Sequence, residues 1–274
     1  SDEKSKGFCP YLLLFIRAWQ EDGYFYCQTE ICSRANCRSM ILSLTTEWEL
    51  ASKRYPSLLR SFPLIGSSND NDRFVPESSL WKICHDVLSG LSHIHSHNIV
   101  HNDIKPSNIF FVSHSRLGCI CKIGDFGLAV DFDSVEDGHE GDTKYMPQEL
   151  LSTNKKRPSA DIFSLGLTLY ELAANNSFVL PSEGPRWHAI RNGGNSLEIP
   201  SSRNQNLVNL IQKMIHPNPN NRPSASNILK DVAMVKESGN AKDKFMTEYV
   251  KDVENYDIER ERELATLQKE ASLR

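Results

Sequence analysis

The sequence reads "HNDIKPSNIF" at residues 101–110 and "KIGDFGL" at residues 122–128. Short loops between apolar runs here hold two acids, a lysine and an asparagine: Asp103, Lys105, Asn108 and Asp125. Phosphoryl transfer needs a base for a hydroxyl nucleophile, a cation beside the transferring phosphate, and ligands for the metal ions on the phosphates. Asp103 can accept the proton, Lys105 can supply the cation, and the oxygens of Asn108 and Asp125 suit Mg²⁺. The pattern therefore indicates phosphoryl-transfer chemistry.

The composition is that of an ordinary globular protein of 274 residues, with 39% hydrophobic and 24% charged residues. A net charge of −4 gives no reason to expect a nucleic acid or an anionic membrane as the main partner. No apolar run approaches the roughly 20 residues of a membrane-spanning helix. We therefore expect neither nucleic acid nor membrane among the partners.

The seven cysteines are odd in number, and their spacing matches neither a zinc ribbon nor a disulfide framework. We interpret them as reduced thiols of a cytosolic or nuclear protein. A metal site formed by Cys27, Cys32 and Cys37 is the less favoured alternative, because no second ligand pair accompanies them.

Periodicity predicts few strands followed by many helices. Residues 11–32 form two β-prone runs around the turn "QEDG", which is typical of a hairpin. Apolar spacing predicts helices at 38–52, 78–96, 159–174, 206–215 and 224–235. Ser79 is the expected cap of the second of these, and "GSSNDND" at 66–72 is an expected loop. The order of elements indicates an α+β fold dominated by helices.

The character of the sequence changes at Lys236, where a charge-rich segment without proline begins. We therefore divide the chain into a domain at 1–235 and a helical tail at 236–274. The heptad pattern in the tail is broken. We therefore favour a helix that packs on the domain, or frays, over a coiled coil.

The motif H-x-D-x-K-P-x-N followed by "GDFG" resembles the protein kinases, and the resemblance runs from about Cys9 to Val235. It implies a kinase-like fold with a complete helical large lobe and only the last strands of the small lobe. It also implies ATP and Mg²⁺ as cofactors. Asp103 would be the catalytic base, Lys105 the phosphate contact, and Asn108 and Asp125 the metal ligands.

The same resemblance assigns supporting positions. Glu149 of "YMPQE" would pair with Arg222 of "NNRPSA", and Asp161 would brace the backbone of the catalytic loop. Asn102 replaces the arginine that reads a phosphorylated activation loop, which puts that control in doubt.

The resemblance also places the adenine site. Thr29 would be the gatekeeper, and the backbone of the next three residues would hydrogen-bond adenine: Glu30, Ile31 and Cys32.

The finer resemblance is to the Wee/Myt family of mitosis-inhibiting kinases. It is carried by "VHNDIKPSNIF", "HEGDTKYMPQELL", "RWHAIRNG" and "MIHPNPNNRPSA", and "WHAIR" and "IHPNPNNRPSA" favour the Wee branch. The family implies phosphorylation of an inhibitory tyrosine in a cyclin-dependent kinase–cyclin complex, negative regulation of mitotic entry, and a nuclear location with the cytoplasm as the alternative. Lys105 alone is the serine/threonine pattern, and here we follow the family.

No G-x-G-x-x-G occurs in the sequence, and no V-A-I-K-like strand precedes Tyr11. We expect an amino-terminally truncated kinase that is inactive by itself. Two alternatives remain open. One is a non-catalytic, kinase-like binding module. The other is a serine/threonine kinase of the type that acts on a translation initiation factor, which shares "KPSNIFF" and "KIGDFGLA" but lacks "EGD" and "WHAIR".

Overall fold

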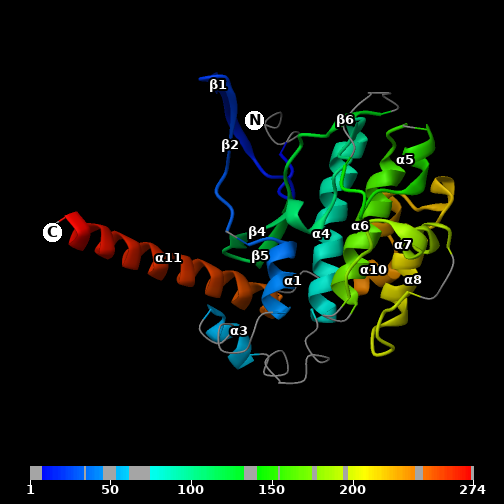
Figure 1. The fold of residues 1–274 in the computed structure, drawn as a ribbon. Coiled ribbons are helices and arrows are strands. Elements are labelled where there is room, and N and C mark those ends of the chain that lie inside the picture. The colour runs from blue at the N-terminus through cyan, green and yellow to red at the C-terminus, as the bar shows by residue number, and fades with distance from the viewer. Residues whose placement is uncertain are drawn as a thin grey trace, which may run out of the picture.

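The computed structural model describes residues 8–33, 35–45, 54–61, 75–132, 141–153, 155–174, 178–193, 197–237 and 243–272. Helices form one body, from which an N-terminal hairpin and a long C-terminal helix extend (Figure 1). The helix-dominated α+β class predicted from the sequence is confirmed. The predicted loop at 66–72 lies outside the described residues.

The N-terminal hairpin consists of β1 (Phe15–Glu21) and β2 (Tyr24–Thr29), which pair antiparallel. The turn residues Asp22 and Gly23 have φ values of 51° and 81°, the left-handed geometry that two-residue hairpin turns prefer. The predicted hairpin is therefore correct, but its first strand begins four residues later than Tyr11. The residues before it run beside the body, where Leu12 forms a parallel bridge with Ile123.

Two long helices form the centre of the body: α4 (Glu77–Ser96) and α6 (Pro158–Ala173). Both agree with the predicted helices to within one residue. Nearly every residue of α6 is buried, as its apolar sequence predicts. A Cβ on its Gly166 would lie 2.6 Å from the Ile215 side chain, so glycine permits the close approach of the segment that ends α8 (Gln205–Met214).

Two details of the helix predictions were wrong. Ser79 is not the cap of α4, because Pro76 occupies that position and Ser79 lies inside the first turn. The helix predicted at 224–235 is two helices, α9 (Ala225–Leu229) and α10 (Val232–Glu237). The carboxylate of Asp231 accepts the N–H of Ala233 at 2.8 Å, so it starts a second helix where the pattern suggested one.

The remaining helices lie around this centre. The helix predicted at 38–52 is α1 (Cys37–Thr45), and 46–53 lie outside the described residues. Asn36 begins α1, because its side-chain oxygen accepts the N–H of Ser39 at 2.8 Å. The other helices are α3 (Pro56–Ser61), α5 (Gln148–Thr153) and α7 (Gly184–Arg191), with the 3₁₀ turns η4 (Pro106–Asn108) and η5 (Pro219–Asn221).

Two further strand pairs among the described residues frame the loops that carry the acids. β4 (Ile109–His114) and β5 (Gly118–Ile123) form a hairpin, and β3 (Ile99–Val100) pairs with β6 (Val130–Asp131). Residues 101–108 connect β3 to β4, and residues 124–129 connect β5 to β6. The pairing therefore brings the two sequence motifs to one place.

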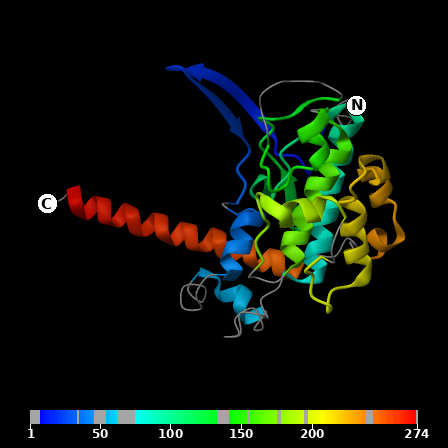
Figure 2. The same cartoon turned by 45° about the vertical axis from the view of Figure 1, so that its right-hand side comes forward.

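The C-terminal helix α11 (Lys244–Ser272) packs on the body with its first half, and its second half projects away (Figure 2). Phe245 and Tyr249 are buried, whereas Leu264 and Leu267 are exposed. The packed-helix interpretation of the tail is therefore confirmed for the first half. In the part of the chain that the structure covers, no helix combines the length and the apolarity needed to cross a membrane.

Candidate active site

Three of the predicted site residues meet in the catalytic loop, residues 101–108. The Nζ of Lys105 lies 2.7 Å from Oδ2 of Asp103. The amide nitrogen of Asn108 donates to the same Oδ2 at 2.8 Å and to the Asp103 carbonyl at 2.9 Å. Asp103 is 8% exposed and Asn108 is 5% exposed, so the carboxylate is held in one orientation by two partners.

Asp161, in the first turn of α6, supports the loop from below. It is fully buried, and its two oxygens accept the backbone N–H groups of His101 and Asn102, each at 2.9 Å. The Nε2 of His95 adds a third contact at 2.9 Å. A carboxylate in the first turn of a helix is also stabilised by the helix dipole. These are the contacts expected of the bracing residue.

His101 joins the catalytic loop to the loop of Asp125. Its buried ring donates from Nε2 to the Gly124 carbonyl at 3.2 Å, and its Nδ1 accepts the Asp103 N–H at 3.3 Å. Only the neutral imidazole satisfies both contacts. Burial lowers the pKa of His101 from its ordinary value, in agreement with that neutral form. The ring of Phe126 packs edge-on against it, with centroids 4.9 Å apart.

Asp125 follows Gly124, whose N–H donates to the Asn108 carbonyl at 3.0 Å. Its φ of 63° lies in the left-handed region, which Asp tolerates better than most residues. The side chain is exposed, and within the described residues its one hydrogen bond is a long contact of 3.4 Å from the Gly127 N–H. The carboxylate is therefore available to a ligand.

The donor set fits Mg²⁺. The amide nitrogen of Asn108 is occupied by Asp103, which leaves its Oδ1 with one 3.4 Å contact from Ser107 in the described part of the chain. That oxygen and the Asp125 carboxylate are hard ligands of the kind that Mg²⁺ prefers. These residues would hold the metal that the resemblance implies.

Asn102 reaches the start of the activation segment directly. Its φ of 62° is left-handed, a conformation in which Asn is enriched. Its amide donates to the Leu128 carbonyl at 3.1 Å, two residues beyond Phe126. The Asn102 side chain thus connects the catalytic loop to the backbone at Leu128. It does so at the position where the kinase motif has arginine.

The proposed hinge lies between β2 and α1. The hydroxyl of Thr29 donates to the Glu30 carbonyl at 3.2 Å, and Ile31 is 94% exposed. Within the described residues, the N–H of Cys32 has no main-chain partner. The Glu30 carboxylate lies 2.6 Å from the Nζ of Lys122, a buried lysine three residues before Asp125.

The Glu30–Lys122 ion pair was missed by the sequence analysis. The only local signal was a lysine inside the apolar run that precedes Asp125. The pair connects the hinge to the strand that leads to the metal-binding loop, and Glu30 also accepts the Leu14 N–H at 2.8 Å.

The segment 141–147 lies against the catalytic loop. A Cβ on Gly141 would come within 2.7 Å of the Asn102 carbonyl, so only glycine fits there without a shift. Arg191 of α7 is 2% exposed and donates to the carbonyls of Thr143, Lys144 and Met146 at 3.1, 2.9 and 2.7 Å. Burial lowers its pKa to about 9, which still leaves the guanidinium charged at neutral pH.

Trp187 completes this support. Its indole N–H donates to the Thr143 carbonyl at 2.9 Å, and its ring lies 3.7 Å from the Arg191 guanidinium carbon. "WHAIR" carries part of the resemblance, but the sequence alone does not predict its contacts with the 143–146 backbone. They require elements more than forty residues apart in the chain.

An ion pair holds the same segment through the Tyr145 hydroxyl, and a second ion pair holds α5, which follows it. Tyr145 donates to Glu171 of α6 at 2.5 Å, and Arg38 of α1 lies 2.9 Å from the other Glu171 oxygen. Arg222 binds Glu149 at 3.0 Å, which is the pair that the sequence predicted. The segment is therefore held by side chains of α1, α6 and α7.

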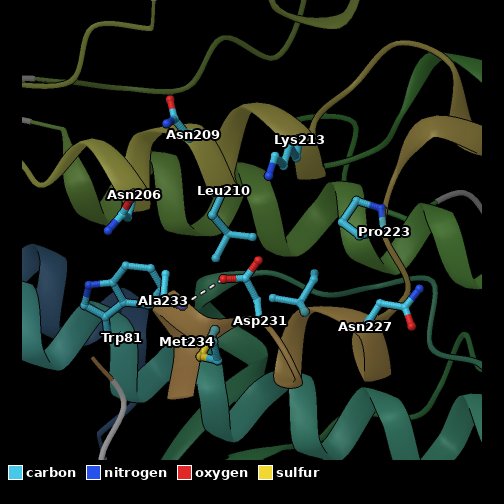
Figure 3. Close-up of a pocket in the computed structure, with 11 residues that line it drawn as sticks. Trp81, Asn206, Asn209, Leu210, Lys213, Pro223, Asn227, Asp231, Ala233 and Met234 are labelled. Atoms are coloured by element: carbon cyan, nitrogen blue, oxygen red, sulfur yellow. Dashed lines mark hydrogen bonds between the residues drawn. The ribbon is translucent and has the colours of Figure 1, made fainter. Parts of the chain in front are cut away.

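Two of the hollows among the described residues are lined by residues of the catalytic loop or of α4. One is bordered by Asn102, Asp103, Asp142 and Tyr145, and its volume of about 10 Å³ fits one water. The other, of about 360 Å³, lies among α4, α8, α9 and α10 (Figure 3). Trp81, Leu210 and Met234 form its apolar part, and Asn and charged side chains border it. None of its lining residues belongs to the catalytic loop.

A family model, "Protein kinase domain", matches residues 4–234 of this chain. The match covers most of the chain and includes every site residue described above. The chain belongs to the protein kinase family.

Curated relatives narrow the resemblance. The chain is 34% identical, over 81% of its length, to the membrane-associated tyrosine- and threonine-specific cdc2-inhibitory kinase of Caenorhabditis briggsae. It is 33% identical over 78% to the kinase of the same description from Drosophila melanogaster. It is 34% identical over 79% to the mitosis inhibitor protein kinase of Candida albicans. The chain is thus similar to mitosis-inhibiting kinases, as the motifs indicated.

The chain spans 29%, 34% and 16% of the length of these three relatives. The relatives include membrane-associated kinases as well as a mitosis inhibitor, and the preference for the Wee branch stays a prediction.

Proposed function

We propose that the protein transfers the γ-phosphoryl group of ATP to a tyrosine of a cyclin-dependent kinase, and so delays entry into mitosis. The observation that carries the proposal is the arrangement of Asp103, Lys105 and Asn108, with Asp125 tied to it through Gly124. The assignment of the substrate rests on the similarity to the mitosis-inhibiting kinases.

The chain's own residues divide the chemistry among them. Bound ATP and Mg²⁺ supply the phosphoryl group and part of the positive charge that the transition state needs. Asp103, held by two partners, orients the substrate hydroxyl and accepts its proton. Lys105 offsets charge on the transferring group. Asn108 and Asp125 would hold the metal, and the main chain of Glu30 to Cys32 would bind adenine.

The segment 141–147 is the proposed platform for the substrate chain. It adjoins the catalytic loop at Gly141 and is fixed by Trp187 and Arg191. Such a preset platform supports a kinase whose competence does not require phosphorylation of this segment. A fixed platform sets the distance from the substrate backbone to Asp103, and this distance distinguishes a long tyrosine side chain from serine or threonine.

Threonine is the second acceptor to consider. The names of the relatives from Caenorhabditis briggsae and Drosophila melanogaster include both tyrosine and threonine specificity, and Lys105 agrees with a threonine acceptor.

We place the protein in the nucleus, with the cytoplasm as the alternative. A kinase that acts on a translation initiation factor and a non-catalytic module are the competing functions.

The test uses the complete protein that contains this chain, ATP, Mg²⁺ and a cyclin-dependent kinase–cyclin complex, with phosphoamino-acid analysis of the product. We expect phosphotyrosine, with or without phosphothreonine, and at least about 10²-fold less product from the Asp103→Asn variant. Product confined to serine, or label on an initiation factor instead, would overturn the substrate assignment. Absence of any transfer, together with absent nucleotide binding, would favour the non-catalytic module.

A further inference from the structure

The first half of α11 is built into the kinase domain, although α11 lies beyond the matched residues 4–234. In Figure 1 its start lies beside α1. Five of its side chains are at least 93% buried: Phe245, Met246, Tyr249, Val250 and Val253. They belong to the same apolar core as the residues of α4, β4 and β5. Within the described residues, the second half is largely exposed, including Ile258, Leu264 and Leu267.

Two buried carboxylates of this region bind the N-terminal turns of helices. Asp243, 6% exposed, accepts the Met246 N–H at 2.8 Å and the hydroxyls of Ser78 and Ser79 at 2.8 and 2.9 Å. Because α4 has no side-chain cap of its own, Asp243 adds a second negative charge beside Glu77 at its N-terminus. Asp252, 3% exposed, accepts the Leu58 N–H in the first turn of α3 at 2.8 Å.

Tyr249 lies at the centre of this contact. Its hydroxyl is 3.3 Å from the hydroxyls of Ser39 and Ser43 in α1. Its ring stacks on Tyr55 at 5.4 Å and meets the edge of Phe111 at 6.1 Å. Burial raises the pKa of Tyr249, so the hydroxyl stays neutral and can donate. One side chain of α11 thus contacts α1, β4 and the residue that precedes α3.

Phe111 continues this connection to the hinge. Its carbonyl accepts the N–H and the hydroxyl of Ser33 at 3.1 and 2.6 Å, and its N–H donates to the Ala35 carbonyl at 3.0 Å. Ser33 directly follows Cys32, the last residue of the proposed hinge. Tyr249 is therefore connected to the residues that follow the hinge by two routes, one through Phe111 and one through α1.

We propose that Tyr249 is a positioning residue for the nucleotide site, through which α11 sets the place of the hinge backbone. This inference rests on the proposed function in one respect, the binding of adenine at Glu30 to Cys32. Tyr249 touches neither nucleotide nor substrate. It packs on β4 and α1, which hold the residues that follow the hinge, so nucleotide affinity depends on a helix outside the matched residues.

The test compares variants of the complete protein at a temperature where each is fully folded. Tyr249→Ala should weaken the binding of Mg²⁺–ATP by about tenfold, because small displacements of a binding group are costly. Tyr249→Phe keeps the ring and loses the hydroxyl contacts, so we expect about threefold. KM for ATP should rise with both, while kcat at saturating ATP stays near that of the unaltered protein. Leu264→Ala, in the exposed half of α11, is the matched control and should change neither.

Ser43→Ala removes the same hydroxyl contact from the α1 side. Its ATP affinity can be measured even if Tyr249→Ala does not fold. Ser43→Ala and Tyr249→Phe together should weaken binding less than the product of their separate effects, because they remove a shared contact. A lower melting temperature with unchanged ATP affinity in all three variants would show a merely structural role and overturn the proposal. An unaltered protein that does not bind ATP would instead refute the proposed function, so the two failures are distinguishable.

Discussion

The catalytic loop and the β1–β2 hairpin differ in how much of each is buried and bonded by other described residues. Asp103 and Asn108 are buried and each has partners in the large lobe. The hairpin leaves much of its apolar surface exposed, with Tyr24 at 69% and Phe25 at 76%. The loop is therefore positioned by its own lobe, whereas the hairpin presents surface that other strands of a small lobe would cover. The base and the phosphate site consequently depend on different parts of the protein.

The largest effect should follow from this difference. We expect residues 1–274 alone to transfer phosphate at a negligible rate, because the chain has no glycine-rich loop and no lysine strand to hold the phosphates. Their absence should remove several kcal/mol of transition-state stabilisation. The measurement is the phosphorylation rate of residues 1–274 against that of the complete protein on one substrate. Equal rates would contradict the assignment of the two roles to separate regions.

The sequence predicts contacts within a short span of the chain better than contacts between distant segments. The catalytic loop could be predicted because its residues act within a short span, where spacing alone sets the geometry. Ser79 was misassigned because α4 begins two residues earlier, and the Ser79 hydroxyl instead donates to Asp243, which lies 164 residues further along the chain. The contacts of Arg191 and the pair Glu30–Lys122 also join distant segments, and no local pattern reveals them.

A smaller effect, confined to the catalytic loop, should come from Asp103→Asn in the complete protein. The amide keeps the size of the side chain but cannot take the proton, so turnover should fall by about 10²- to 10⁴-fold. Binding of Mg²⁺–ATP should remain close to that of the unaltered protein. The measurements are single-turnover phosphorylation and nucleotide titration.

Asp125→Asn is the matched comparison for that variant. Asp125 is exposed and lacks a strong partner, so its replacement should leave the fold intact and weaken metal-dependent nucleotide binding. If Asp103→Asn weakened nucleotide binding as much as Asp125→Asn does, the division between a proton acceptor and a metal ligand would be wrong.

The smallest effect concerns the contact between the two loops. Burial lowers the pKa of His101, so below its ordinary pKa of about 6.5 the unfolded chain binds the proton before the folded chain does. The stability that His101 contributes is complete above that pH. It is lost as the pH falls through the lowered pKa of the folded state, because a protonated Nδ1 can no longer accept the Asp103 N–H. The measurement is the free energy of unfolding of the complete protein by denaturant, between about pH 5.5 and about pH 7.5. His101→Gln should make the free energy of unfolding depend less on pH in this range. His97→Gln, at an exposed histidine, is the control, and its profile should be steeper than that of His101→Gln. An unchanged profile in His101→Gln would show that the imidazole does not couple the loops through its neutral form.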